Sequence, residues 1–133
     1  MNTPSVNSSL TFSGRIRSVQ HAARGIRTML LTQHNAWIHA AVTVVTISAG
    51  FGLGISPIEW CMVVLAIVSV WTAEALNTAL EYLTDIASPD YHPIAGRAKD
   101  IAAGAVLICA IGAAIVGLIV FGPHLLQVLG ARA

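Results

Sequence analysis

Three long apolar segments dominate this sequence of 133 residues. They cover approximately residues 35–54, 58–86 and 98–121, and each is long enough for a helix to cross the hydrocarbon core of a bilayer. Only 10% of the chain is charged, against about 25% in an ordinary soluble domain. A soluble protein of this size could not bury so much apolar surface in its own core. The sequence therefore predicts an all-α membrane protein with three transmembrane helices.

The segment before the first span is polar and basic. Residues 1–12 are predicted to form a disordered tail. In residues 13–32, apolar side chains recur every three or four positions, and the arginines cluster off that stripe. A basic amphipathic helix of this kind commonly lies in the plane of the lipid headgroups. We therefore expect an amphipathic surface helix at the start of a single membrane domain, residues 13–133. Its arginines are Arg15, Arg17, Arg24 and Arg27.

The positions of the basic residues predict how the chain crosses the membrane. The connection at 51–57 contains no Lys or Arg, whereas Arg97 and Lys99 lie between the second and third spans. By the positive-inside rule, the N-terminus and the 87–97 loop face the cytoplasm of a bacterial inner (plasma) membrane. The net charge of +1 gives no support to a nucleic-acid partner.

Polar residues on the second span need a separate explanation. Glu74, Asn77, Glu81 and Asp85 recur at nearly helical intervals. A turn of about 100° per residue brings the three carboxylates within about 40° of one another. Each ionisable group at bilayer depth costs about 2.5–3.5 kcal/mol on insertion scales. This acidic stripe therefore predicts a functional site, an ion path or mutual structural pairing.

The segment after the stripe, SPDYHPIAGRAKD, supplies groups that suit phosphate chemistry. Carboxylates beside an amide suit a hard cation such as Mg²⁺, and Arg and Lys suit phosphates. A carboxylate held in apolar surroundings suits a general base that acts on a hydroxyl. Together these features predict phosphoryl transfer at the membrane–cytoplasm interface. The chain contains no P-loop motif, so a nucleotide site would have to be built in another way.

Two motifs, EALNTALEYLTD (74–85) and YHPIAGRAKDIAAGAVL (91–107), closely resemble the signature of the prokaryotic diacylglycerol kinase family, which includes undecaprenol kinases. The resemblance runs from about residue 15 to residue 122. It implies an integral-membrane lipid kinase, a homotrimer whose composite sites move the γ-phosphoryl of MgATP to a lipid hydroxyl. Diacylglycerol and undecaprenol are both open as acceptors, with diacylglycerol slightly favoured as the family label.

The resemblance also implies roles for individual residues. Glu74 would take the proton from the lipid hydroxyl, Asn77 would position Glu74 or the substrate, and Glu81 would hold Mg²⁺. The predicted ATP contacts are Asp90, Tyr91, His92, Lys99 and Asp100. The predicted contacts to lipid headgroups or phosphate are Arg17, Arg24 and Arg27.

One position departs from the family pattern. The second metal-binding Glu of the family falls on Gln33, in LLTQHNAWIH, and no acidic residue precedes Glu59. Gln33 is therefore predicted as a metal ligand that offers a carbonyl oxygen without charge. The change leaves open an impaired or non-catalytic member that binds lipid or nucleotide as a regulator. A transporter that uses the acidic stripe is a third alternative, but three short spans without a broken helix give it little support.

Overall fold

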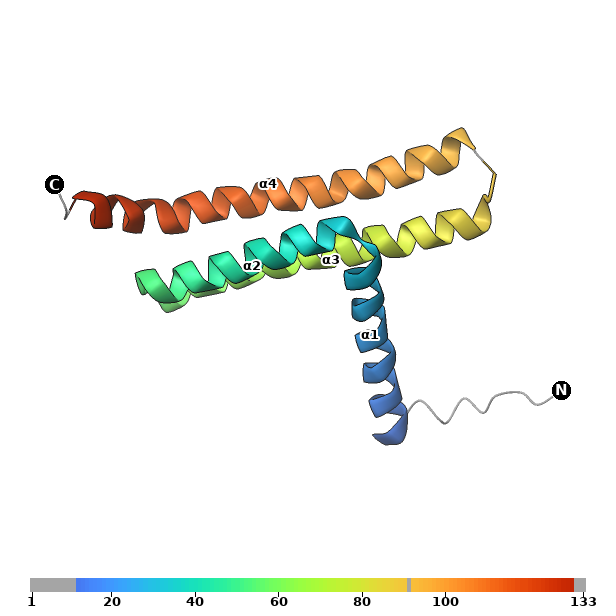
Figure 1. The fold of residues 1–133 in the computed structure, drawn as a ribbon, viewed down its shortest axis with the longest axis horizontal. Coiled ribbons are helices and arrows are strands. Elements are labelled where there is room, and N and C mark those ends of the chain that lie inside the picture. The colour runs from blue at the N-terminus through green and yellow to red at the C-terminus, as the bar shows by residue number, and fades with distance from the viewer. Residues whose placement is uncertain (1–11, 91, 131–133) are drawn as a thin grey trace. The chain divides into compact units, whose positions relative to one another are not determined.

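The computed structural model describes residues 12–90 and 92–130, which form four helices with short connections. The helices are α1 Phe12–Thr32, α2 His34–Leu53, α3 Pro57–Ala87 and α4 Pro93–Gly130 (Figure 1). No strand occurs within these two described ranges. The chain divides into two compact units, of which the first, Met1–Gln33, contains α1 and the second, His34–Ala133, contains α2, α3 and α4.

The three helices of the second unit are each long and apolar enough to cross a membrane, which confirms the three predicted spans. They alternate in direction, so that α3 runs back along α2 and α4 runs back along α3 (Figure 1). The 31 residues of α3 extend about 46 Å at about 1.5 Å per residue, which exceeds the roughly 30 Å hydrocarbon core. Part of α3 therefore extends into the polar interface.

A tight turn joins α2 to α3. Gly54 adopts a left-handed conformation with φ 65°, and the N–H of Ile55 donates to the carbonyl of Gly50 at 3.2 Å. This is a common way to close a helix C-terminus, because glycine has no Cβ to clash in that conformation. The turn allows only three residues to separate Leu53, where α2 ends, from Pro57, where α3 begins.

A capping box starts α3. The N–H of Ser56 donates to Oε2 of Glu59 at 2.7 Å, and the N–H of Glu59 donates to Oγ of Ser56 at 3.4 Å. Pro57 occupies the first turn, where a missing N–H has no cost. The other carboxylate oxygen of Glu59 lies 3.0 Å from Nε2 of His124 on α4. Glu59 therefore links the first turn of α3 to the C-terminal part of α4.

A small apolar core lies at the same end of the second unit. Ile55, Val63 and Val120 are buried in it, and Trp60 packs against them. Gly50 lies so close to Trp60 that a Cβ there would stand 2.7 Å from the indole ring. Many other large apolar side chains on the three helices are exposed, as expected for surfaces that face lipid or another subunit.

The helix α4 extends beyond the predicted span at both ends. It begins at Pro93, whereas the predicted span begins at 98, and it continues through Pro123 to Gly130. A proline inside a helix removes one hydrogen bond and usually ends or kinks the helix, which is why the span was predicted to end at 121. The contact between His124 and Glu59 holds the turn after the proline against α3.

Candidate active site

Glu74 lies near the middle of α3 and is completely buried. Neither oxygen of its carboxylate has a hydrogen-bond partner among the residues that the structure describes. Its backbone carbonyl accepts a hydrogen bond from Oγ1 of Thr78 at 2.9 Å, so the hydroxyl of Thr78 serves the helix and not the carboxylate. A buried carboxylate without partners is costly for folding, so the position of Glu74 calls for a functional explanation.

Asn77 and Glu81 continue the same face of α3. Nδ2 of Asn77 donates to Oε1 of Glu81 at 3.0 Å. Asn77 is buried and Glu81 is half-buried, so the face becomes more accessible toward the end of α3. The helical spacing that predicted the acidic stripe thus gives a buried carboxylate first and a hydrogen-bonded amide–carboxylate pair after it.

His39 on α2 faces Glu74. Its Nε2 lies 3.9 Å from Oε2 of Glu74, which is too long for a hydrogen bond, and Nε2 has no other partner in the described ranges. The imidazole stands edge-on to the indole of Trp71, with ring centroids 6.4 Å apart. Nε1 of Trp71 in turn donates to Oγ1 of Thr43 at 3.1 Å. His39 also lines an apolar cavity of about 380 Å³ between α2, α3 and α4.

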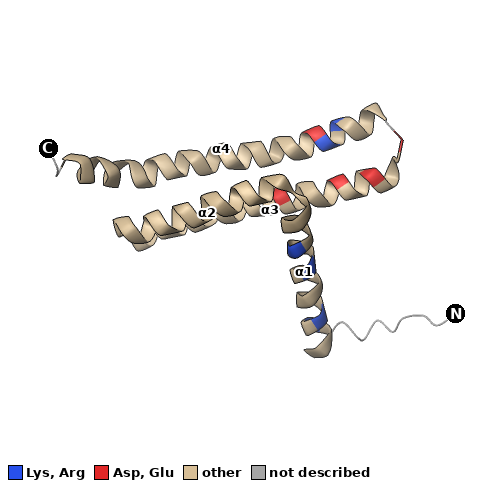
Figure 2. Ribbon diagram, in the orientation of Figure 1, with Lys and Arg blue, Asp and Glu red and all other residues tan. Residues whose placement is uncertain are grey.

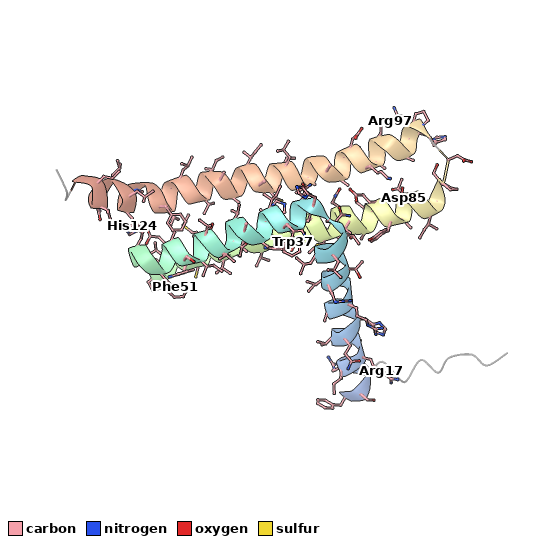
Figure 3. All side chains as sticks on the ribbon, viewed as in Figure 1. Arg17, Trp37, Phe51, Asp85, Arg97 and His124 are labelled. Carbon is pink, nitrogen blue, oxygen red and sulfur yellow. The ribbon has the colours of Figure 1, made fainter. Side chains whose placement is uncertain are left out.

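The end of α3 and the start of α4 carry the charged part of the site. Asp85 on α3 and Lys99 on α4 form an ion pair. Figure 3 shows Asp85 and Arg97 at one end of the second unit and His124 at the other. Tyr91 lies outside the described residues. The other predicted nucleotide contacts in this region are all exposed: Asp90, His92 and Asp100.

Local hydrogen bonds shape the connection between these two helices. Oγ of Ser88 donates to the carbonyl of Asp90 at 3.0 Å, and Nδ1 of His92 accepts from the N–H of Ile94 at 3.2 Å. His92 therefore helps to start α4, which the sequence motif did not reveal. Figure 2 shows the charges of α4 gathered near this connection, and no Lys, Arg, Asp or Glu follows Asp100 up to Gly130.

The remaining predicted site residues belong to the first unit. They are Arg17, Arg24, Arg27 and Gln33. The three arginines are exposed, and Nη2 of Arg24 lies 3.1 Å from Nδ1 of His21. Gln33 follows the last residue of α1, and its N–H donates to the carbonyl of Met29 at 2.9 Å. The part that these four residues play in a site stays a prediction.

Comparison with known proteins identifies the family of this chain. The profile of the family described as prokaryotic diacylglycerol kinase matches residues 20–121. This chain belongs to that family. The protein is therefore a membrane lipid kinase that uses ATP, as the sequence motifs predicted. No comparison favours the non-catalytic regulator.

Individual relatives of this kinase differ in the lipid that they are named for. The chain is 40% identical to the undecaprenol kinase of Bacillus subtilis over 109 residues, which cover 82% of this chain and 89% of the relative. It is 39% identical to the diacylglycerol kinase of Synechocystis over 113 residues, which cover 84% of this chain and 65% of that longer protein. The diacylglycerol kinase of Escherichia coli K12 is 25% identical over 118 residues, or 89% and 97% of the two chains.

The side chains of this kinase fit a metal ion that arrives with its nucleotide. Within residues 12–90 and 92–130, no group of three or more His, Cys, Asp or Glu side chains could hold a metal ion alone. Mg²⁺ typically needs only one or two protein carboxylates when phosphate oxygens and water complete its shell. Glu81, which is half-buried and beside the Asn77 amide, meets that requirement.

The sequence did not predict that His39 would lie beside Glu74. Its one signal was a polar side chain inside an apolar span, which also fits a residue that only stabilises helix packing. Which way α2 turns toward α3 depends on the packing of the two helices and cannot be read from the periodicity of either one.

Proposed function

We propose that this lipid kinase uses Glu74 as the base that activates a lipid hydroxyl, with undecaprenol as the preferred acceptor. The observation that carries the proposal is the complete burial of a carboxylate without hydrogen-bond partners in the described part of the chain. A base for a lipid hydroxyl must lie at the depth of the lipid, and at least one oxygen of its carboxylate must be free to accept the proton. Glu74 meets both conditions.

The proposed reaction is a direct transfer. The acceptor hydroxyl gives its proton to Glu74 while its oxygen bonds to the γ-phosphorus of ATP. The bond between that phosphorus and the β,γ-bridging oxygen breaks, and ADP leaves with the electron pair. The products are a lipid phosphate and ADP, and the proton on Glu74 then returns to water. Such transfers depend mainly on positioning and on stabilising the phosphate charge.

We assign the nucleotide side of the site to the charged end of α3 and α4. Glu81, held by Asn77, would be one ligand of nucleotide-bound Mg²⁺, and Gln33 would be the second. Mg²⁺ would supply neutralisation of phosphate charge. Lys99 pairs with the exposed Asp85, so its flexible side chain could exchange that carboxylate for a phosphate at little cost. The remaining proposed ATP contacts are Asp90, Tyr91, His92 and Asp100.

The same reasoning supports an assembly in the membrane. Asp90, His92 and Asp100 are exposed on a single chain, so another surface would be needed to enclose ATP. We therefore propose a homotrimer with composite sites on the cytoplasmic side of the bacterial inner membrane. In this arrangement α1 lies on the membrane surface as an amphipathic helix. Its proposed contacts to headgroups or phosphate are Arg17, Arg24 and Arg27.

The relatives favour undecaprenol as the first acceptor to test. The undecaprenol kinase of Bacillus subtilis shares 40% identity over 89% of its length, whereas the diacylglycerol kinase that matches over 97% of its length shares 25%. Diacylglycerol stays the second candidate because the Synechocystis relative, at 39% identity, carries that name.

The test is phosphorylation of each lipid by the purified protein in mixed micelles with labelled ATP and Mg²⁺. We expect kcat/KM for undecaprenol to exceed that for dioleoylglycerol at least tenfold. Glu74→Gln keeps the shape of the side chain but cannot accept the proton, so it should lower kcat by about 10²–10⁴-fold. Glu59→Gln is the matched control, because Glu59 lies on the same helix beside His124, and it should stay within about threefold of the parent. A Glu74→Gln variant with more than a tenth of the parent activity would exclude Glu74 as the base.

A further inference from the structure

The half-buried imidazole of His39 on α2 faces the fully buried carboxylate of Glu74 on α3. Nε2 of His39 and Oε2 of Glu74 are 3.9 Å apart, and neither atom has a hydrogen-bond partner among the described residues. A side-chain rotation that shortens the distance by about 1 Å would give an ordinary N–H···O bond. Two unpartnered atoms at this distance, a ring nitrogen and a carboxylate oxygen, are therefore close enough to pair when Nε2 carries the ring proton.

The other side-chain hydrogen-bond donors on this side of α3 are already engaged. The Asn77 amide donates to Glu81, and the Thr78 hydroxyl donates to the backbone of Glu74. Lys99 pairs with Asp85 at the far end of α3. The His39 imidazole thus has a ring nitrogen, Nε2, that lies 3.9 Å from the carboxylate and has no other hydrogen bond among the described residues.

The neighbours of His39 hold its helix face next to α3. His39 and Thr43 are one turn apart on α2, and Trp71 and Glu74 are one turn apart on α3, so each pair lies on one helix face. The indole of Trp71 stands edge-on to the imidazole and donates to Thr43 at 3.1 Å. This contact holds the face of α2 that carries His39 against the face of α3 that carries Glu74.

We propose that His39 is a positioning residue for Glu74, and this inference rests on the proposed role of Glu74 as the base. The Nε2–H group of His39 binds Oε2 of the carboxylate and so leaves Oε1 to accept the proton of the lipid hydroxyl. A carboxylate on a flexible side chain without this bond would sample several orientations. Misplacement of a reacting group by about 1 Å can cost about 10²-fold in rate, so a single orienting bond has a measurable effect.

Steady-state kinetics of His39 variants provide the first half of the test. His39→Phe keeps a planar ring but has no donor, and we expect kcat to fall about 30- to 100-fold with KM for lipid and for ATP changed less than about threefold. His39→Gln places an amide N–H near the position of Nε2 and should recover at least about a third of the parent kcat. Ser69→Ala is the control, because the Ser69 hydroxyl donates to the carbonyl of Leu65 on its own helix, and it should behave as the parent does.

Infrared spectroscopy provides the second half and does not depend on turnover. The difference between the spectra of the parent and of Glu74→Gln isolates the carboxyl bands of Glu74. We expect those bands to shift in His39→Phe, to return toward the parent position in His39→Gln, and to stay in place in Ser69→Ala.

Either of two results would overturn the inference. One is a His39→Phe variant whose kcat stays within threefold of the parent. The other is an unchanged set of Glu74 bands in that variant, because a loss of activity would then arise from packing. If the parent phosphorylates neither lipid, the proposed acceptors are wrong, and the infrared comparison still decides whether His39 binds Glu74.

Discussion

Asp85 and Lys99 join the last turns of α3 to the first turns of α4 through an ion pair between side chains that are 62% and 39% exposed. Exposed pairs of this kind contribute only about 0–1 kcal/mol to stability. Because the pair contributes so little, Lys99 could leave Asp85 for a phosphate group with only a small loss of folding free energy.

We therefore predict that Lys99→Met raises KM for ATP about tenfold or more and shifts the melting temperature little. Asp85→Asn removes the other partner of the ion pair and is the control, so it should leave KM for ATP within about threefold. Kinetics at varied ATP and fixed lipid give both values. Equal effects of the two substitutions on KM would mean that the ion pair, and not a phosphate contact, explains the importance of Lys99.

A second prediction concerns the hydrogen bond between Asn77 and Glu81. Asn77→Leu keeps the branched outline of the side chain but removes the amide N–H that donates to Oε1 of Glu81 at 3.0 Å. We expect the Mg²⁺ concentration for half-maximal activity to rise about tenfold, because a less ordered ligand binds a cation more weakly. Titration with Mg²⁺ at saturating ATP measures the change. An unaltered Mg²⁺ dependence would remove Glu81 from the proposed metal site.

A third prediction concerns Gln33. Replacement by Glu adds a charge where the family pattern has one, so Gln33→Glu should lower the half-maximal Mg²⁺ concentration about tenfold and leave kcat at saturating Mg²⁺ within about threefold. Gln20→Glu makes the same chemical change on α1 and is the control. A large rise in kcat in Gln33→Glu alone would instead identify the natural protein as an impaired kinase.

A fourth prediction concerns packing at the α2–α3 turn. Gly50→Ala places a Cβ 2.7 Å from the Trp60 ring, so it should destabilise the protein by about 1–3 kcal/mol. Gly52→Ala meets nothing within 4 Å and should be neutral or stabilising. Thermal unfolding in detergent measures both.

The double variant Gly50→Ala/Trp60→Leu tests the cause of that effect. Removal of the indole should recover much of the stability lost in Gly50→Ala, because the two side chains then no longer compete for space. Independent, additive losses would mean that the contact between them is not the origin.

Much of the fold follows from local sequence signals. The bounds of α2 and α3 differ from the predicted spans by one residue at each end, because Gly54 and Pro57 mark the turn between them. The end of α4 could not be predicted in this way. Pro123 is a local signal to stop, and the contact that holds the following turn, from His124 to Glu59, joins residues far apart in the sequence.

The residues of the candidate site also fall into two groups, those that local spacing predicted and one that depends on helix packing. Helical spacing was sufficient to place Glu74, Asn77 and Glu81 on one face of α3. It gave no information about what lies opposite that face, because the rotation of α2 is set by packing. His39 was therefore missed, although it lies 3.9 Å from the central carboxylate.

The tight turn at Gly54 also fixes how far along α3 each residue of α2 lies. Because three residues join α2 to α3, the two helices have almost no freedom to slide past each other, and the level at which His39 meets Glu74 is counted from the turn. That turn lies at the opposite end of the helices from the charged connection. With Glu74 as the proposed base, the depth of the acceptor hydroxyl in the bilayer would thus be set from the membrane surface opposite the proposed nucleotide site, by residues that take no part in the proposed reaction.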